Sequence, residues 1–277
     1  MDDTSPISPE EHFQEIPAHF HHSAVAHASP RLPQAIAHRG FKGQYPENTL
    51  LSIDGAIRAG AQALELDLHI SRDGIVVLSH LTNEPFDIMQ RIAKTIESVP
   101  KPTDAPDWHR RIVLGCWSAR YLPARAKHLP RYAVTLICVD LSYARQFLQV
   151  PLISFNVNQM ILMGPLGRGF LDEARAARRQ VYVWTVNAPN LMRWCIRHGI
   201  DGVISDEPGR FRQVCEGWEK EHTGVLGAPN PELDRIPLRQ RIQIIAVALY
   251  VICFGWILKR MYLTPVERLE FEKHKSK

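Results

Sequence analysis

The sequence predicts a parallel (β/α)8 TIM barrel over residues 35–218, and three observations lead to this fold class. Strand-like and helix-like segments alternate along these residues, which is typical of a parallel sheet with crossover helices. About eight segments have the apolar pattern of strands, the number that closes such a barrel. Side chains suited to acid–base and metal chemistry directly follow several of these strands, and barrels place their sites at those ends.

Length and composition agree with one main domain. The 277 residues are 45% hydrophobic, which is enough for one substantial core, and the net charge of +4 comes with no nucleic-acid motif. The five cysteines are odd in number and widely spaced, so we expect reduced thiols in a cytosol-facing protein. No apolar segment opens the chain, so we expect no secretory signal peptide.

The chain is expected to begin with a disordered tail, residues 1–34. This tail is rich in Pro, Ser, Asp, Glu and His and has no sustained apolar period, so it cannot offset the entropy cost of ordering. Its five histidines could bind a metal loosely, but a solvated polar tail is the simpler interpretation.

The first predicted strand, Ala35–His38, is followed by a helix over Asn48–Ala59 with apolar residues at helical spacing. Ala63–Ile70 then alternates aliphatic residues with polar ones, two of which are Glu65 and Asp67. This alternation places both carboxylates on the same side of one strand. On pattern alone they could be solvated side chains at a sheet edge.

Four features at the strand ends together favour a reactive site instead. His38 and His80 end two predicted strands, and imidazole titrates near neutral pH. Glu65 and Asp67 offer the oxygen ligands that Mg²⁺ or Ca²⁺ takes. Arg39 could clamp a phosphate oxygen with its planar fork. A single histidine at a strand end is more often structural than catalytic. The indication of a reactive site therefore comes from all four features occurring together.

The alternation weakens after His80 and resumes at Ile112. One helix over 86–99 and a proline-rich loop lie between them. Segment 152–155 could be a strand or an irregular stretch. Strands are expected at 75–79, 112–116, 134–139, 152–155, 181–186 and 203–204, and helices near 118–128, 142–148, 170–178, 189–198 and 207–218.

An apolar run, Ile242–Leu258, follows a polar linker at 219–241 and has basic residues on both flanks. At about 1.5 Å per residue this run is short of a 30 Å hydrocarbon core, but residues 261–263 extend it past a snorkelling Lys-Arg pair. We therefore expect residues 242–263 to form a transmembrane or membrane-anchoring helix, followed by a basic tail at 264–277. The alternative is a helix packed on the barrel.

Several short motifs can be read along residues 35–218. They are His38-Arg39-Gly40, Pro46–Thr49, the Glu65/Asp67 pair, Ser71–Gly74, Trp184–Asn187 and Asp201–Asp206. Together they resemble the motifs of the glycerophosphodiester phosphodiesterase family. The resemblance implies the same barrel, attack on phosphorus by a neighbouring hydroxyl of the substrate's glycerol group, and a divalent metal. Carried over, it implies His38 and His80 as the acid–base pair and Glu65 and Asp67 as metal ligands, and it places Trp184 in the substrate cleft, although a core tryptophan is a comparable interpretation.

Within the family, the His-Arg-Gly-Phe-Lys opening, the Trp184 segment and the apolar tail are most similar to fungal phosphatidylglycerol phospholipases C. This similarity implies metal-dependent hydrolysis of glycerophospholipid, chiefly phosphatidylglycerol to diacylglycerol and glycerol 3-phosphate. It also implies a C-terminally anchored protein whose catalytic domain faces the cytosol. A catalytically impaired homologue that retains lipid or phosphate binding, and a soluble glycerophosphodiesterase, are the alternatives.

Two departures from the family pattern follow the third strand. Leu81 stands where the family has Asp after His80, and no segment before Ile112 resembles the family strand that carries the third metal ligand and a lysine. Only about 180 residues separate His38 from Trp218, whereas such a barrel typically takes about 250. The sequence therefore predicts a barrel that lacks one strand–helix unit after residue 80, with two unpaired edges and low or no activity.

Overall fold

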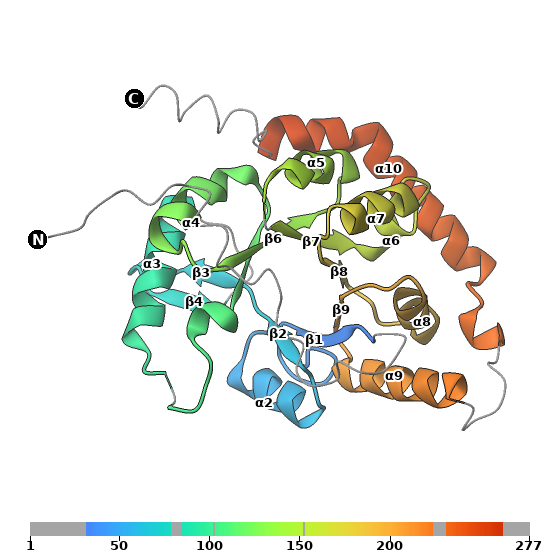
Figure 1. Cartoon of the computed structure of the whole chain (residues 1–277), viewed down its shortest axis with the longest axis horizontal. Coiled ribbons are helices and arrows are strands. Elements are labelled where there is room, and N and C mark those ends of the chain that lie inside the picture. Colours follow the sequence, from blue (N-terminus) through green and yellow to red (C-terminus); the bar gives the residue numbers. More distant parts are fainter. Residues whose placement is uncertain (1–31, 79–84, 102, 152, 224–230, 263–277) are drawn as a thin grey trace, which may run out of the picture.

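The main body of the protein is a curled parallel sheet surrounded by helices (Figure 1). The computed structural model describes residues 32–78, 85–101, 103–151, 153–223 and 231–262. In this part of the chain the main sheet has seven strands in the order β2-β1-β9-β8-β7-β6-β5. These strands are β1 (Gln34–His38), β2 (Ala63–Glu65), β5 (Val113–Cys116), β6 (Ala133–Cys138), β7 (Ile153–Asn158), β8 (Val181–Trp184) and β9 (Gly202–Ser205).

Helices follow the strands and cover the outside of the sheet (Figure 1). Their order confirms the predicted alternation, and α6 is a short helix that the sequence did not predict. The helices are α2 (Leu50–Arg58), α3 (Pro85–Ser98), α4 (Leu122–His128), α5 (Leu141–Gln146), α6 (Gln159–Leu162), α7 (Gly167–Ala176), α8 (Pro189–Arg197), α9 (Pro208–His222) and α10 (Leu238–Tyr262).

Of the eight segments expected as barrel strands, the one expected at 75–79 forms a strand outside the main sheet, and the prediction of a single strand over Ala63–Ile70 was also wrong. This segment is not one strand: β2 ends at Glu65, and β3 (Leu68–Ile70) leaves the main sheet and pairs antiparallel with β4 (Val76–Leu78). Alternation of apolar and polar residues does not distinguish one long strand from two short strands with a bend between them. By contrast, β7 is a regular strand that pairs with both β6 and β8, so residues 153–155 form a strand, as one of the two interpretations of this segment expected.

The two ends of the main sheet are β2 and β5, as predicted for a barrel that lacks one strand. The β3–β4 hairpin and α3 lie beside β5 and α4 (Figure 1). Ile88, Met89 and Ile92 of α3 share an apolar cluster with Leu114 of β5. The hairpin and α3 therefore belong to the same folded body as the sheet.

The main core lies between the sheet and its outer helices. Phe155 and Val183 of neighbouring strands are fully buried there with Phe170 of α7 and Phe211 of α9. Cys116, Cys138, Cys195 and Cys215 are buried free thiols, as expected for a reduced protein, whereas Cys253 is exposed. Burial raises the pKa of the Cys116 thiol to about 12, which keeps it protonated and unreactive near neutral pH.

The segment expected to be a polar linker makes a buried contact. Arg193 of α8 is only 5% exposed, and its guanidinium donates to Glu221 at 2.7 and 3.0 Å and to Asp234 at 2.7 Å. Residues after Trp218 therefore supply the ionic partners of a buried arginine in the barrel domain. The polar composition of this segment does not show that two of its carboxylates, Glu221 and Asp234, are the ionic partners of Arg193. The boundary of the N-terminal tail also shifts, because Gln34 already belongs to β1.

Helix α10 is 25 residues long. At 1.5 Å per residue this is about 37 Å, more than the 30 Å of a hydrocarbon core. In the described residues, one stretch, Pro231–Gly255, is long and apolar enough to cross a membrane by length and composition alone. The helix packs on α6 through buried Ile244 and Ala248, and Leu249 and Tyr250 face outward.

Candidate active site

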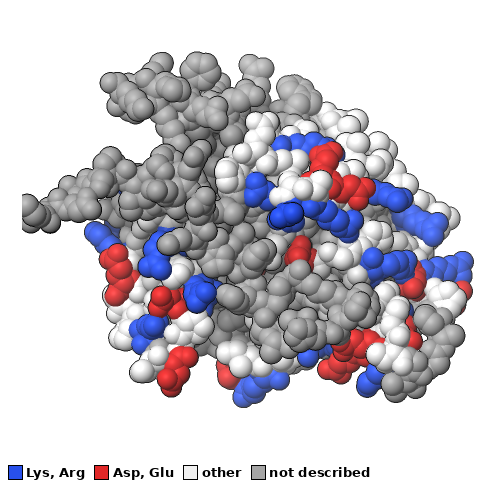
Figure 2. All heavy atoms as spheres, in the orientation of Figure 1, with Lys and Arg blue, Asp and Glu red and all other residues white. Residues whose placement is uncertain are grey.

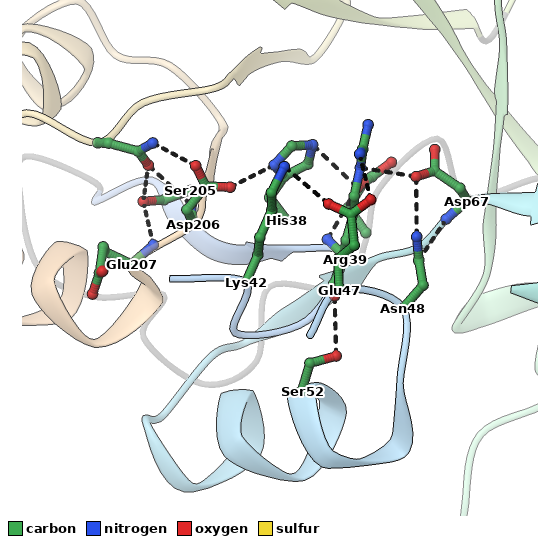
Figure 3. Close-up of polar contacts among 12 residues, drawn as sticks. His38, Arg39, Lys42, Glu47, Asn48, Ser52, Asp67, Ser205, Asp206 and Glu207 are labelled. Carbon is green, nitrogen blue, oxygen red and sulfur yellow. Dashed lines mark hydrogen bonds and ion pairs between the residues drawn. The ribbon is translucent and has the colours of Figure 1, made fainter. Parts of the chain in front are cut away.

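The candidate site lies at the carboxyl ends of neighbouring strands β2, β1 and β9 (Figure 3). His38 is the last residue of β1, Glu65 is the last residue of β2, and Asp206 directly follows β9. The register of the parallel sheet pairs His38 with Glu65. Three chain segments that are far apart in sequence thus bring an imidazole and two carboxylates together.

The His38 imidazole is held between two carboxylates. Its Nδ1 lies 2.7 Å from Asp206 Oδ1, and its Nε2 lies 4.0 Å from Glu65 Oε2. Since a carboxylate only accepts hydrogen bonds, Nδ1 carries the proton and donates it to Asp206. Neutral His38 then presents an unprotonated Nε2 on the side of Glu65, the form that a general base requires.

Asn187 holds the Asp206 carboxylate in place. The Asn187 amide donates to Asp206 Oδ2 at 2.6 Å, and its oxygen accepts from the Asp206 backbone N–H at 2.9 Å. Ser205 Oγ also donates to that oxygen, at 3.1 Å. Burial opposes ionisation of Asp206, but hydrogen bonds from His38 and Asn187 outweigh it and the pKa of Asp206 is lowered. The acceptor for His38 is therefore ionised near neutral pH.

Asp206 and Asn187 were missed as site residues, although both lie in motifs that the sequence displayed. A signal was present: an Asp that directly follows a short buried strand stands where His38 and Glu65 stand on their strands. The partnership itself joins residues 168 positions apart, and nothing in the local pattern shows it.

Arg39 begins the loop after β1 in a left-handed backbone conformation, with φ of 55°. Its Nη1 donates to Glu47 at 3.0 Å, and its Nε lies 2.9 Å from Asp67 Oδ2. Its backbone carbonyl accepts from Asn48 N at 2.9 Å and from Ser52 Oγ at 3.1 Å, which ties the loop to the start of α2. Arg39 thus lies in the site as predicted, with its guanidinium on two carboxylates (Figure 3).

Glu65 and Asp67 lie near one another, but not on one strand as expected. Asp67 falls in the bend between β2 and β3, where its Oδ2 accepts from Asn48 Nδ2 at 3.3 Å. The pKa of Glu65 is raised, first by burial and also by the neighbouring Asp67 charge, although His38 opposes the shift.

This donor set fits a weakly held divalent cation. Mg²⁺ is usually bound by one or two carboxylates together with water and substrate phosphate, and Glu65 and Asp67 supply two carboxylates. In the described ranges no group of three or more His, Cys, Asp or Glu side chains could hold a metal ion, so the third acidic ligand expected from the resemblance is not found there.

Three further side chains, Glu47, Lys42 and Trp184, lie at this end of the sheet. Glu47 bridges Arg39 and Lys42, which lies 3.0 Å from its Oε2, and the Lys42 hydrogen bond is the main cause of the lowered pKa of Glu47. Trp184, at the end of β8, donates from Nε1 to the Asn156 carbonyl at 3.0 Å. This contact fits a packing role for Trp184, whose indole is partly buried at the carboxyl end of the sheet. His80 lies outside the described residues.

The fold and the site together define a class of protein. The fold is a barrel-like parallel α/β sheet, and the site at the carboxyl ends of its strands has an imidazole between two carboxylates, with two basic side chains nearby. The chain belongs to the glycerophosphoryl diester phosphodiesterase family, whose sequence profile matches residues 38–83 and 83–210, more than half of the chain. The resemblance inferred from the motifs is thereby confirmed at the level of the family.

Individual relatives align with a shorter part of the chain than the family profile does. The chain is 43% identical over 49 residues to a glycerophosphodiester phosphodiesterase of Bacillus altitudinis, which is 18% of this chain and 20% of that protein. It is 44% identical over 52 residues to human lysophospholipase D GDPD1, which is 19% of this chain and 17% of that protein. The match therefore spans only about a fifth of the length of these curated relatives.

Solved structures agree on the fold. A phosphodiesterase from Oleispira antarctica, in complex with the product sn-glycerol-3-phosphate, aligns with a TM-score of 0.56 and 18% identity over 67% of this chain and 97% of that one. A glycerophosphoryl diester phosphodiesterase from Silicibacter pomeroyi aligns with a TM-score of 0.53 and 18% identity over 68% and 95%. The curled seven-stranded sheet is thus similar to the barrel of this family.

Replacing Asp206 by Asn is expected to lower kcat by up to about 10⁴-fold, the effect of replacing the Asp that fixes the tautomer of a general-base histidine. The amide keeps the shape but offers His38 Nδ1 no charged acceptor. The ¹⁵N NMR signals of His38 would show the changed tautomer. An unchanged tautomer with unchanged kcat would mean that Asp206 does not position His38.

Proposed function

We propose that this protein hydrolyses a phosphodiester bond of glycerophospholipids with the help of a divalent cation. The observation that carries the proposal is the His38 imidazole, which is fixed by Asp206 at Nδ1 and faces the Glu65/Asp67 pair with Nε2. Family membership supports the reaction class. We further propose phosphatidylglycerol as the substrate, with diacylglycerol and glycerol 3-phosphate as products. The similarity to a lysophospholipase D supports a lipid substrate, with one or two acyl chains.

In this proposal His38 and His80 transfer protons, and Arg39 binds the charged phosphate oxygens. His38 Nε2 removes the proton from a glycerol hydroxyl of the head group as its oxygen bonds to phosphorus. The bond from phosphorus to the lipid alcohol oxygen breaks, and His80 protonates that oxygen. Water then opens the cyclic phosphate to give glycerol phosphate. Arg39, now on Glu47 and Asp67, is the nearest guanidinium for the phosphate oxygens.

Glu65 and Asp67 would hold Mg²⁺ or Ca²⁺ in this proposal. A bound cation neutralises charge on the phosphate oxygens and on the two carboxylates. The reason to expect a cation is the closeness of the two carboxylates, since the Asp67 charge disfavours ionisation of Glu65 and a cation would offset that repulsion.

Replacing Glu65 by Gln is expected to weaken Mg²⁺ binding by about 10–100-fold. Without metal, the free energy of unfolding of the variant should be at least as large as that of the parent. The folded-state pKa of Glu65 is raised, so its ionised form destabilises the fold at any pH above its unfolded pKa. Calorimetric Mg²⁺ titrations and thermal melts in chelator measure the two effects. Equal titrations for variant and parent would remove Glu65 from the cation site.

We also propose that α10 attaches the protein to a membrane, with the barrel on the cytosolic side. The support is its length of 25 residues and its exposed Ile245, Leu249 and Phe254. Release of the full chain by carbonate extraction would instead favour a soluble glycerophosphodiesterase whose α10 only covers the barrel.

A second candidate function is lipid or phosphate binding without turnover. The missing strand–helix unit and the lack of a third carboxylate in the described residues favour it. The deciding experiment assays the purified chain on phosphatidylglycerol vesicles with Mg²⁺ and with chelator. Metal-dependent release of glycerol 3-phosphate is expected. Vesicle binding without release in either buffer would favour the second candidate, and neither binding nor release would contradict both.

A further inference from the structure

Lys42 is a basic side chain of the site to which the proposed reaction gives no role. It belongs to the loop that follows β1, and this loop is fixed at two points. The Gly43 N–H donates to the Asp206 carbonyl at 3.0 Å, and the Phe41 N–H donates to the Ser52 carbonyl at 2.8 Å. The loop therefore lies between the end of β9 and α2, which gives Lys42 a defined place at the carboxyl end of the sheet.

The loop approaches the end of β9 closely. A Cβ added at Gly43 would lie 2.9 Å from the Asp206 carbonyl oxygen, so no other residue fits there without a shift of the backbone. Lys42, next along the chain, is near enough to Asp206 for its charge to help lower the pKa of that carboxyl. Because Asp206 accepts from His38, the Lys42 ammonium lies within electrostatic reach of the base and its partner.

One carboxylate holds two cationic side chains. Glu47 Oε1 accepts from Arg39 Nη1 at 3.0 Å, and Glu47 Oε2 lies 3.0 Å from Lys42 Nζ (Figure 3). Each oxygen of the same carboxylate thus takes one cation, which brings the guanidinium and the ammonium side by side. Two cationic donors in this arrangement can bind two oxygens of one phosphate group.

The Lys42 ammonium can bind an anion without leaving Glu47. An ammonium has three N–H donors, and the Glu47 carboxylate takes one of them. The Lys42 side chain is 37% exposed, compared with 17% for Arg39. An ion pair this exposed contributes little to stability, so a small rotation of the ammonium toward a ligand costs little. Lys42 is thus the more accessible of the two cationic groups.

The local charge also favours a bound anion. Arg39 contacts a second carboxylate, Asp67, which belongs to the proposed cation site. With a divalent cation on Asp67, Arg39 and Lys42 share only Glu47, and one positive charge is left over. In the described part of the face in Figure 2, basic and acidic side chains are interspersed. An anion therefore gains from this local pair and not from a broad basic surface there.

We propose that Lys42 binds the phosphate group of the substrate together with Arg39, and that Glu47 positions both side chains for this contact. The inference rests on the proposed function and adds a substrate-binding residue to the same site. The chemistry recognised is the phosphate group, and the glycerol and acyl parts are not needed. The contact therefore applies equally to sn-glycerol 3-phosphate, which is a soluble probe.

Replacing Lys42 by Met removes the charge and nearly keeps the length of the side chain. We expect the dissociation constant of sn-glycerol 3-phosphate, measured by calorimetry with the full chain in Mg²⁺, to rise about tenfold. This is the low end for a hydrogen bond to a charged group, because the ammonium is partly exposed. Lys42→Arg should keep most of the affinity, and Lys94→Met, at an exposed lysine of α3, should keep all of it. Parental affinity in Lys42→Met would overturn the inference.

A Glu47→Gln background separates direct contact with phosphate from an effect through Glu47. The alternative is that Lys42 acts only by holding Glu47, and thereby Arg39, in place. In Glu47→Gln that ion pair is absent, and direct contact predicts that Lys42→Met still weakens sn-glycerol 3-phosphate binding by at least about threefold. The factor is smaller than in the parent because the ammonium is less well positioned. No further loss in this background would show a structural role for Lys42 and contradict the proposal.

The binding measurement does not depend on turnover. If the parent releases no glycerol phosphate from phosphatidylglycerol but binds sn-glycerol 3-phosphate through Lys42, the proposed hydrolysis fails and this inference stands. If the parent hydrolyses the lipid and Lys42→Met binds the probe like the parent, the reverse holds. A parent that binds no sn-glycerol 3-phosphate in Mg²⁺ or in chelator also excludes the phosphate contact. Should Lys42→Met not melt cooperatively, Lys42→Gln repeats the comparison with the same expected result.

Discussion

Replacing His38 by Ala is expected to lower kcat by about 10²–10⁴, the usual contribution of general acid–base catalysis. The fold should persist, because His38 is at the end of its strand and the apolar core lies elsewhere. Glycerol phosphate release from phosphatidylglycerol measures the loss, and imidazole in the buffer should restore part of it. His109→Ala, remote from the site, serves as the control.

Retention of more than about a tenth of parental turnover would exclude His38 as the base. The same comparison applies to His80→Ala, for which the family resemblance implies a loss of similar size. An inactive parent would make both variants uninformative for turnover, and that outcome is decided beforehand by the assay with Mg²⁺ and chelator.

Ending the chain after Trp218 is expected to lower the free energy of unfolding by about 3–5 kcal/mol, the usual cost of leaving a buried charge without its partner. Arg193 would lose both Glu221 and Asp234 and would keep only its contact with the Trp218 ring. Denaturant unfolding of this shortened chain, compared with a chain ended after Pro237, measures the effect. The longer of the two keeps both carboxylates and lacks α10.

A matched variant separates the effect of the unpaired Arg193 charge from the other effects of shortening the chain. Arg193→Met in the chain ended after Trp218 should recover most of the lost stability, because an apolar side chain of similar length needs no partner. Equal stability of the two shortened chains would show that the segment after Trp218 is a passive linker, as its polar composition first suggested.

Local sequence patterns predicted most helices and strands to within a few residues. The α8 segment, expected near 189–198, runs from Pro189 to Arg197, since apolar spacing and a proline at its start are local signals. The same patterns placed His38 at a strand end and Glu65 in the strand that it ends. They failed at Asp67, where a bend interrupts the alternation, and they could not pair His38 with Asp206 or Arg193 with Asp234. Those contacts depend on how distant segments meet.

The place of β1 between β2 and β9 has a consequence for the order in which the protein is made. At about 5–20 residues per second, roughly 10–30 s of synthesis separate His38 from Asp206, its partner 168 residues later. During that interval one edge of β1, with its apolar Ala35 and Ile36, has no strand to pair with. The nascent chain thus carries an aggregation-prone edge and an incomplete site until β9 leaves the ribosome, and closing the sheet both protects the strand and assembles the site.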